Sequence, residues 1–397
     1  MPTYKYLIIG GGMTGDAAAR GIRQFDSSGS IGMVSMEPDP PYDRPSLSKG
    51  LWKTKPFERI WRKTADLGVE LHLGKTITGL DLSHKQAMDN ENTVFSYEKL
   101  LLATGGTPRR LPFGGDDIIY YRTLADYRRL RKLADERQNF LVIGGGFIGA
   151  EIAAALSMNH KHVVLVFPED GVNGRIFSHS MSIFLNDFYR NKGVEVLAKH
   201  QVSGVERHGD SILVKVNDLT NNTGREIEVD SVVAGIGIQP NIALAQAAGL
   251  ATGNGILVNE FLETSHPDVY AAGDVAFFYN PALDTRMRVE HEDNALSMGM
   301  WVGKNMAGGH NSYDHLAYFF SDLFELGYEA VGELDAQKEI VDDWKEPYHQ
   351  GVVYYLTNNR VRGVLLWNVW GKVDAARNLV ADPGPFNPAD LLNKIPS

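Results

Sequence analysis

Apolar and polar residues alternate in blocks over the first part of the chain, in the order expected of strands followed by helices. An apolar run at residues 4–9 is followed by glycines and then by a helical pattern at 16–25. The same order recurs at 140–143 and 150–159. Such alternation, continued to about residue 245, favours βαβ units and parallel sheets with helices on both faces. The pattern therefore predicts an α/β fold.

The pattern changes in the second half of the chain. Short strands separated by polar turns are predicted at 202–206, 211–216 and 227–234, and they suggest hairpins appended to the second βαβ unit. A strand at 269–272 runs into Gly273 and Asp274 and then into a loop. A further group of predicted elements comprises strands at 330–334, 351–357 and 361–369, a turn at Asn358 and Asn359, and a helix at 372–379. This group indicates a separate small α+β domain, which ends in a Pro-rich tail without expected chemistry.

Both early junctions between strand and helix carry the glycine pattern G-x-G-x-x-G. The copies are Gly10, Gly12, Gly15 and Gly144, Gly146, Gly149. The glycines allow a tight turn and a close approach of a pyrophosphate, and the helix N-terminus offers unpaired N–H groups to the phosphates. An acidic residue is expected about 20 positions later to bind a ribose hydroxyl, and Glu37 and Glu169 occupy such places. One copy of the motif is weak evidence, whereas two complete copies predict two dinucleotide-binding units.

Composition narrows the classes of function. A net charge of -10 argues against general nucleic-acid binding, which needs clustered Lys and Arg. The basic residues between 122 and 137 are interleaved with acidic ones and fit a solvated helix face. The chain contains no cysteine, which excludes disulfides, thiolate metal sites and a dithiol relay, and its scattered histidines suggest no metal site. No apolar stretch is long enough to span a membrane and no signal peptide is apparent, so we expect a cytoplasmic protein.

Two dinucleotides in one chain suggest that a hydride passes between them, from a nicotinamide to a flavin. We expect FAD at the first site and exchangeable NADH at the second. Carboxylates at Glu37 and Glu169 favour hydroxyl groups over a phosphate, so NADH should be preferred to NADPH. Asp170 adds to that preference, while the neighbouring Arg175 acts against it.

Several segments resemble known flavoproteins. YDRPSLSKGLW (42–52), ATGGTPRRLP (103–112), VYAAGDVAFF (269–278) and VEHEDNA (289–295) are similar to the glutathione-reductase type. The absence of a dithiol points to the ferredoxin reductase and apoptosis-inducing factor branch. FPEDGVNGRI (167–176), YFFSDLFELGYEAVG (318–332) and GVVYYLTNNRVRGVLLWNV (351–369) closely resemble apoptosis-inducing factor. The resemblance covers almost the whole chain and implies an FAD-binding domain at 1–115 and 245–317, an NAD-binding domain at 116–244 and a C-terminal α+β domain at 318–397.

The resemblance also implies binding residues. For FAD they are Gly10, Gly12, Met13, Thr14, Gly15, Glu37, Arg44, Lys49, Ile77, Thr104, Gly105, Arg109, Asp274, Glu290 and His291. For NAD they are Gly145, Gly146, Phe147, Ile148, Glu151, Glu169, Gly237 and Glu329. Asp274 would bind the ribityl chain and Arg109 the pyrophosphate. A loop cap and a surface charge are the alternatives for these two residues.

The implied catalytic residues are Lys49, Glu151, His291 and Phe320. Lys49 would lie beside the reactive nitrogen of the flavin, paired with Glu151, and would favour the anionic reduced form. A surface lysine and an ordinary helix residue are the alternatives. His291 would position the rings without transferring a proton, or would be structural, and Phe147 would be displaced by the nicotinamide, or would be a core residue.

Departures from the family pattern matter as well. Phe320 stands where apoptosis-inducing factor has a tryptophan, so stacking on bound NAD should be weaker. A short run at 335–347 replaces a long Ser/Pro-rich insertion of the family. We therefore expect the redox core to be shared, but not the roles in cell death or chromatin binding.

The electron acceptor stays open among three hypotheses. The first is oxygen, a quinone or another small oxidant. The second is a ferredoxin or rubredoxin, an iron–sulfur protein that would dock on basic residues, for which the candidates are Lys53, Lys55, Arg59, Arg62 and Lys63. The third is a redox-gated interaction protein with slow turnover, whose oligomeric state, such as a homodimer of the reduced form, changes when NADH binds.

Overall fold

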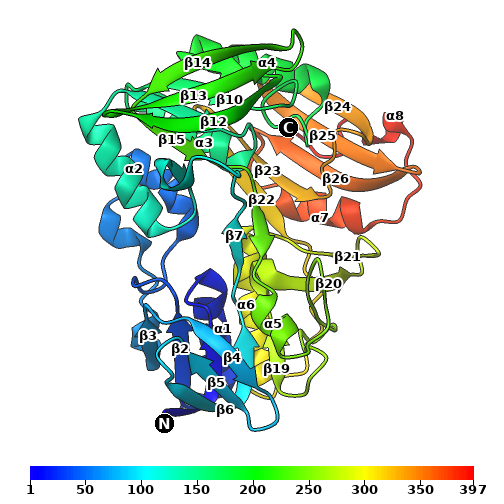
Figure 1. Ribbon diagram of the computed structural model, residues 1–397. Coiled ribbons are helices and arrows are strands. Elements are labelled where there is room, and N and C mark those ends of the chain that lie inside the picture. The colour runs from blue at the N-terminus through cyan, green and yellow to red at the C-terminus, as the bar shows by residue number, and fades with distance from the viewer. The chain divides into compact units, whose positions relative to one another are not determined.

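The computed structural model describes all 397 residues, which form two compact units. Unit 1 contains residues 1–44, 57–107 and 239–319, and unit 2 contains residues 45–56, 108–238 and 320–397. Both units combine sheets with helices, which confirms the predicted α/β fold class (Figure 1). Lys49 belongs to unit 2, although the segments on either side of residues 45–56 belong to unit 1.

The main sheet of unit 1 is built around parallel strands. Its order is β3-β2-β1-β6-β5-β4, and β19 pairs with β6. The parallel strands are β1 (Thr3–Ile9), β2 (Ile31–Ser35), β3 (Val69–Leu73), β6 (Val94–Leu102) and β19 (Val269–Ala271). β4 (Ile77–Asp81) and β5 (Gln86–Asp89) continue the sheet as antiparallel strands. A second, smaller sheet contains β17 (Thr252–Gly253), β18 (Gly255–Leu257), β20 (Ala276–Asn280) and β21 (Thr285–Met287).

Two helices of unit 1 pack closely, and one of them was not predicted. α1 (Met13–Phe25) begins at the first glycine motif, and α6 (Glu292–Met306) packs against it (Figure 1). A Cβ added to Gly303 would lie 2.1 Å from the Ala18 carbonyl oxygen, and one added to Gly299 would lie 2.7 Å from the Ala17 Cβ. Glycines on the contact face therefore let the two backbones touch. The sequence prediction of a loop after Asp274 missed α6, because glycines in a helix interior weaken the helical pattern.

The parallel sheet of unit 2 has the order β11-β10-β9-β15-β8. Its strands are β8 (Ile118–Tyr120), β9 (Asn139–Ile143), β10 (His162–Val166), β11 (Val194–Leu197) and β15 (Ser231–Ala234). The associated helices are α2 (Leu124–Glu136), α3 (Phe147–Met158) and α4 (His179–Asn191). An antiparallel sheet of β12 (His200–His208), β13 (Ser211–Asp218) and β14 (Thr223–Val229) follows as predicted hairpins.

The prediction of one strand over 227–234 was wrong. β14 ends at Val229 in the antiparallel sheet, and β15 begins at Ser231 in the parallel sheet. Asp230, between them, accepts hydrogen bonds from the backbone N–H groups of Gln138 and Asn139 at 3.1 and 2.7 Å. The chain changes sheets at this residue because its carboxylate satisfies the N–H groups at the start of β9. A continuous apolar pattern hides such a change.

The C-terminal part of unit 2 is a five-stranded antiparallel sheet in the order β22-β23-β26-β25-β24. The strands are β22 (Tyr318–Leu323), β23 (Leu326–Gly332), β24 (Glu339–Glu346), β25 (Gln350–Thr357) and β26 (Arg360–Trp367). α7 (Val373–Ala381) packs on the sheet and α8 (Pro388–Leu391) follows. The predicted hairpin turn is confirmed, with left-handed φ values of 52° at Asn358 and 59° at Asn359. The short run at 335–347 is not a plain connection, since it contains the edge strand β24.

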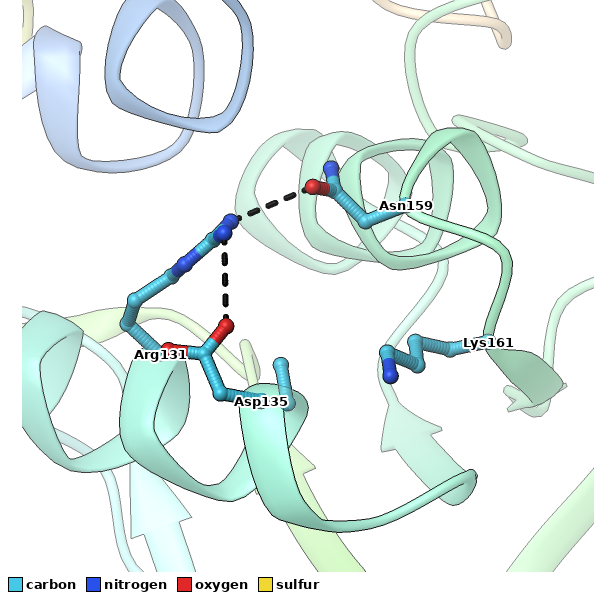
Figure 2. Close-up of a pocket in the computed structure, with 5 residues that line it drawn as sticks. Arg131, Asp135, Asn159 and Lys161 are labelled. Carbon is cyan, nitrogen blue, oxygen red and sulfur yellow. Dashed lines mark hydrogen bonds and ion pairs between the residues drawn. The ribbon is translucent and has the colours of Figure 1, made fainter.

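Residues 45–56 are fastened to the helices of unit 2 through Trp52. The Arg131 guanidinium lies 5.3 Å from the centre of the Trp52 ring, and the Asn159 side chain donates a hydrogen bond of 3.1 Å to the Trp52 carbonyl. Figure 2 shows Arg131 and Asn159 joined to each other, beside a cavity of about 210 Å³ that Asp135 and Lys161 also line. The segment that carries Lys49 is therefore held by α2 and by the end of α3.

Candidate functional site

The two glycine motifs form open cradles at the N-termini of α1 and α3. A Cβ added to Gly12 or to Gly146 would meet nothing within 4 Å. Both residues have extended backbone angles, with φ and ψ of -87° and -170° at Gly12 and of -83° and -166° at Gly146. Bare backbone beside open space at a helix N-terminus is what a pyrophosphate group requires. Both motifs therefore fit the phosphates of a dinucleotide.

The other motif glycines maintain the turns. Gly10 has a left-handed φ of +122°, and its added Cβ would lie 2.1 Å from the Ala103 carbonyl oxygen. A Cβ added to Gly149, in the second motif, would lie 1.8 Å from the Gly144 carbonyl oxygen. These positions exclude any side chain, so the roles of the glycines are divided as the motif requires.

Glu37 lies beyond β2 in unit 1, within a polar cluster. Its carboxylate accepts a hydrogen bond of 2.6 Å from the Tyr42 hydroxyl and pairs with Arg44 at 2.7 Å. Burial opposes the charge of Arg44, but Tyr42 and Glu37 outweigh burial and hold the pKa of Arg44 above its usual value. The structure thus brings together Glu37 and Arg44, which were both predicted to bind FAD.

Asp274 is brought to the first motif by the turn that precedes it. Gly273 has a φ of +77°, and a Cβ there would lie 2.2 Å from the Thr14 Oγ1 of α1. Arg288, which the sequence analysis did not identify, donates a hydrogen bond of 3.1 Å to the Asp274 carbonyl and pairs with Glu290 at 2.5 Å. The Arg288 side chain is only 9% exposed. It therefore fixes two of the predicted FAD-binding residues relative to each other.

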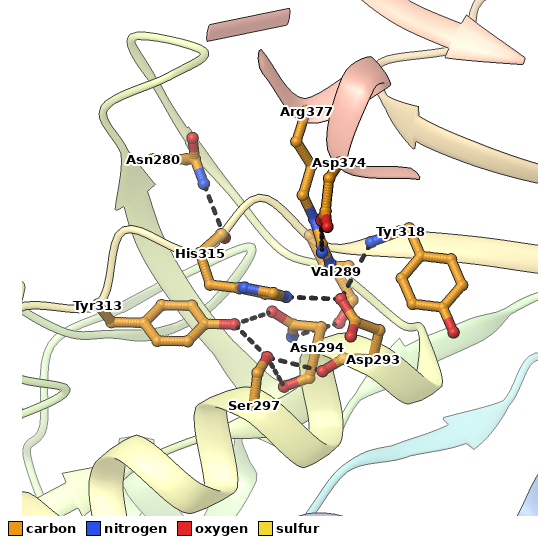
Figure 3. Close-up of polar contacts among 10 residues, drawn as sticks. All are labelled: Asn280, Val289, Asp293, Asn294, Ser297, Tyr313, His315, Tyr318, Asp374 and Arg377. Atoms are coloured by element: carbon orange, nitrogen blue, oxygen red, sulfur yellow. Dashed lines mark hydrogen bonds and ion pairs between the residues drawn. The ribbon is translucent and has the colours of Figure 1, made fainter. Parts of the chain in front are cut away.

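The segment that contains Glu290 and His291 is held by a buried polar network at the start of α6. Figure 3 shows Asn294 between Val289 and Tyr313. Asn294 donates to the Val289 carbonyl at 3.1 Å and accepts from the Tyr313 hydroxyl at 3.0 Å. His291 precedes the helix and stacks on Phe319, with a distance of 4.2 Å between ring centres. This stacking ties the segment before α6 to Phe319.

The remaining residues predicted for FAD in unit 1 lie at three places: Met13 begins α1, Ile77 begins β4, and Thr104 and Gly105 follow β6. Ile77 and Met13 are buried, and the Thr104 hydroxyl donates to the Asn241 carbonyl at 2.9 Å. Gly105 has a left-handed φ of 62°. Lys49 and Arg109 are the two members of the set that belong to unit 2.

Glu169 lies beyond β10 in unit 2, beside the second motif. It pairs with Arg175 at 2.6 Å, and the Arg175 side chain is 81% exposed. Asp170 faces Lys199 at 3.2 Å and His179 at 3.4 Å. The carboxylates are thus accompanied by cationic side chains, a feature that bears on the choice between NADH and NADPH.

Other residues predicted for NAD lie on three elements of unit 2. Gly145 and Phe147 belong to the second motif; Phe147 is half-buried, and Ile148 is exposed. Gly237 has a φ of +89°, and its carbonyl accepts a hydrogen bond of 2.9 Å from the Arg109 backbone N–H. Glu329 on β23 has a buried Oε2 without a hydrogen-bond partner. Burial raises the pKa of Glu329, against a smaller effect of the Gly371 backbone N–H.

Lys49 and Glu151 meet inside unit 2. The Lys49 ammonium lies 2.6 Å from Glu151 Oε1, and the Glu151 side chain is 2% exposed. The same ammonium lies 5.0 Å from the centre of the Phe320 ring. Three of the four predicted catalytic residues therefore contact one another, and the ion pair expected from the family resemblance is present.

Comparison with known protein families agrees with this geometry. Residues 4–299 match the pyridine nucleotide-disulphide oxidoreductase model. The chain belongs to this family. Residues 337–382 match the model of the C-terminal domain of mitochondrion-associated apoptosis-inducing factor, which confirms the predicted resemblance.

Individual relatives cover nearly the whole chain. Monodehydroascorbate reductase 3 of Arabidopsis thaliana is 33% identical over 92% of this chain and 89% of its own length. Mitochondrial apoptosis-inducing factor 1 of Dictyostelium discoideum is 33% identical over 95% of this chain and 78% of its own. Putidaredoxin reductase, solved in a covalent complex with putidaredoxin, superposes with a TM-score of 0.89 at 30% identity, covering 98% of this chain and 95% of that one.

Family membership supports the two expected cofactors, FAD and NAD(H), and a flavin-dependent NAD(P)H oxidoreductase activity. The family name refers to a disulfide, but this chain has no cysteine, so a dithiol of its own takes no part. No helix is both long and apolar enough to cross a bilayer.

Proposed function

We propose that the protein transfers a hydride from NADH to bound FAD and then passes electrons to a separate acceptor. The observation that carries this proposal is the pair of open glycine cradles, one in each unit, each followed by a carboxylate at the end of the next strand. A single-nucleotide enzyme would not need two such cradles. Bound FAD would supply the chemistry of accepting a hydride and releasing electrons.

In this proposal the first motif, Glu37, Arg44 and Asp274 hold FAD. Gly12 leaves room for the pyrophosphate, and Glu37 accepts hydrogen bonds from ribose hydroxyls. Tyr42 and Arg44 orient the Glu37 carboxylate, as their contacts of 2.6 and 2.7 Å indicate. Asp274 follows Gly273, whose backbone lies against Thr14 of the first motif, and its charge acts on Arg44.

The second motif and Glu169 would hold NADH. A carboxylate at Glu169 favours the two ribose hydroxyls of NADH, whereas a 2′-phosphate would be repelled. Arg175, Lys199 and His179 temper this preference, because all three are cations or potential cations within contact distance of Glu169 or Asp170. We therefore propose that NADH is preferred by a moderate margin.

Lys49 would supply a fixed positive charge to the reacting ring system. Its ammonium is held by Glu151 and lies against Phe320. A cation at this position stabilises negative charge that develops on an acceptor ring. Glu151 makes burial of that cation tolerable, since an unpaired buried charge would cost several kcal/mol.

The acceptor defines two candidate activities. The first is reduction of oxygen, a quinone or another small oxidant. The second is reduction of a small iron–sulfur protein, which the likeness to putidaredoxin reductase favours. Among the basic residues considered for docking, Arg62 is engaged within unit 1, because it pairs with Asp16 at 2.6 Å and with Asp43 at 2.8 Å. Arg59 and Lys63 are exposed.

A redox-gated interaction protein with an NADH-dependent oligomeric state, such as a reduced homodimer, is the third proposal carried from the family resemblance.

The assignment of the two motifs is tested by Glu169→Ala, with Glu37→Ala as the matched variant. Loss of charged hydrogen bonds to a ribose, worth about 1.5–3 kcal/mol each, should weaken NADH binding by roughly tenfold to a hundredfold while FAD stays bound. NADPH should be affected less, because Arg175 is released from its ion pair. Glu37→Ala should instead lower FAD retention. An inverted result, with FAD lost from Glu169→Ala and NADH affinity intact, would refute the assignment.

A further inference from the structure

The Glu151 carboxylate is contacted by more than the lysine. The Ser48 hydroxyl donates a hydrogen bond of 2.6 Å to Oε2, and the Ser321 hydroxyl donates one of 2.5 Å to Oε1. Ser48, Glu151 and Ser321 are 5%, 3% and 0% exposed. Both serines belong to unit 2, as do Lys49 and Glu151.

The arrangement is built from two dipeptides that approach one carboxylate. Ser48 and Lys49 come from the segment 45–56, and Phe320 and Ser321 come from β22. In each dipeptide, one residue donates a hydroxyl hydrogen bond to Glu151. In the first dipeptide the other residue is Lys49, which carries the ammonium group. In the second it is Phe320, whose ring contacts that ammonium. The position of the ammonium thus depends on how the carboxylate is held.

Few other groups around Glu151 can hold its carboxylate in place. Tyr189 and Tyr328 are two titratable residues that interact electrostatically with Glu151. Burial raises the pKa of both phenols well above its usual value, and the negative charge of Glu151 adds to the effect. Both phenols therefore stay neutral, and the Tyr189 hydroxyl donates to the Ala150 carbonyl rather than to the carboxylate. Two serines and one lysine are the donors to this buried charge.

We infer that Ser48 and Ser321 are positioning residues that fix Glu151 as an oriented carboxylate and so place the Lys49 charge that tunes the flavin. Ser48 occupies Oε2, which leaves Oε1 for Lys49 and Ser321. Hydrogen bonds from neutral donors stabilise a buried carboxylate without cancelling its charge. The inference rests on the proposed function, in which Lys49 lies beside the flavin.

The test measures the midpoint potential of the flavin in the holoenzyme between pH 6 and 9. Ser48→Ala and Ser321→Ala each remove one donor, so the Glu151 carboxylate and the Lys49 ammonium that it binds are no longer held in one position. The reduced flavin should then be disfavoured about tenfold, a fall of about 30 mV for a two-electron couple.

Two controls distinguish positioning from a general effect of losing a buried hydroxyl. Ser46→Ala removes a 7% exposed serine of the same segment, whose hydroxyl accepts from Lys55 at 2.6 Å and does not contact Glu151. It should leave the potential and its pH dependence unchanged. Repeating Ser48→Ala in a Lys49→Met/Glu151→Gln background, which has neither charge, should abolish the shift.

The outcomes separate the inference from the proposed function. Potentials of the two serine variants equal to that of Ser46→Ala at every pH would overturn the inference, and so would a shift that persists in the uncharged background. A wild-type protein that NADH does not reduce, or a Lys49→Met/Glu151→Gln variant with an unchanged potential, would instead contradict the proposed function.

Discussion

Substitution of Gly146 by valine should remove NADH binding without harming the fold. The position has an extended backbone, φ -83° and ψ -166°, which a β-branched residue adopts readily. The space where a Cβ would stand is open for 4 Å. Replacing glycine where the backbone is compatible stabilises a protein by about 0.4–1 kcal/mol, because the unfolded chain loses freedom. We therefore expect the thermal midpoint to be unchanged or slightly higher.

The cost to NADH binding is set by the contacts that the valine side chain prevents. A pyrophosphate in the cradle would accept hydrogen bonds from backbone N–H groups at the start of α3. Losing two such bonds to a charged group, at about 1.5–3 kcal/mol each, gives at least about 3 kcal/mol. This corresponds to more than a hundredfold weaker binding, since about 1.4 kcal/mol is a factor of ten.

The assay combines thermal unfolding with reduction of the flavin under anaerobic conditions. Gly146→Val should keep its visible flavin spectrum and be bleached normally by dithionite, but should need more than a hundredfold more NADH. Gly12→Val, the matched change in the first motif, should lose FAD instead. Gly149→Val serves as the steric control and should unfold, because its Cβ would lie 1.8 Å from a carbonyl oxygen. If Gly146→Val bound NADH like the wild type, or lost FAD, the assignment of the second cradle would be refuted.

Three further changes test the electrostatics of the fold. Asp16→Asn should lower the free energy of unfolding by about 3 kcal/mol in a urea titration, because the wholly buried Asp16 carboxylate is the 2.6 Å partner of Arg62; a loss below 1 kcal/mol would contradict this. The hydrogen bond from Lys5, with those from the Gly29 and Ser28 backbone and Tyr6, lowers the pKa of Asp26. The contribution of Asp26 to stability should be present above the unfolded pKa and lost as pH falls through the folded one, so Asp26→Asn should destabilise more at pH 7 than at pH 2, as thermal midpoints would show. Burial raises the pKa of Glu329, so ionisation of this carboxyl opposes folding as pH rises. Glu329→Gln should therefore raise the melting temperature at pH 8 and leave it unchanged at pH 4. A lower melting temperature at pH 8 would exclude this explanation.

Local patterns were sufficient to predict the elements around both glycine motifs. The strands before Gly10 and Gly144 and the helices after Gly15 and Gly149 follow from apolar periodicity and from turn geometry. The C-terminal hairpin at Asn358 and Asn359 followed likewise from residues that tolerate left-handed φ values. Each of these features depends on neighbours in sequence.

What could not be predicted depends on partners distant in sequence. The glycines of α6 make sense only against the backbone of α1, and Asp230 ends a strand because β9 needs its carboxylate. Ser48 and Ser321 lie 103 and 170 positions from Glu151, and nothing in their own segments indicates a buried acceptor. The ion pair of Lys49 was expected only from a family resemblance. The hydroxyl donors around it required the three-dimensional structure.

The central claim is that NADH reduces a flavin held by this chain. An anaerobic titration of the purified protein with NADH, recorded over the whole visible spectrum and followed by admission of air, tests it most directly. We predict that the flavin bleaches at one equivalent of NADH per bound FAD. A broad long-wavelength band that persists in air would favour a long-lived reduced complex with NAD, and immediate reoxidation without that band would favour an oxidase or an electron-transfer reductase. A flavin that dithionite bleaches but NADH does not would contradict the account.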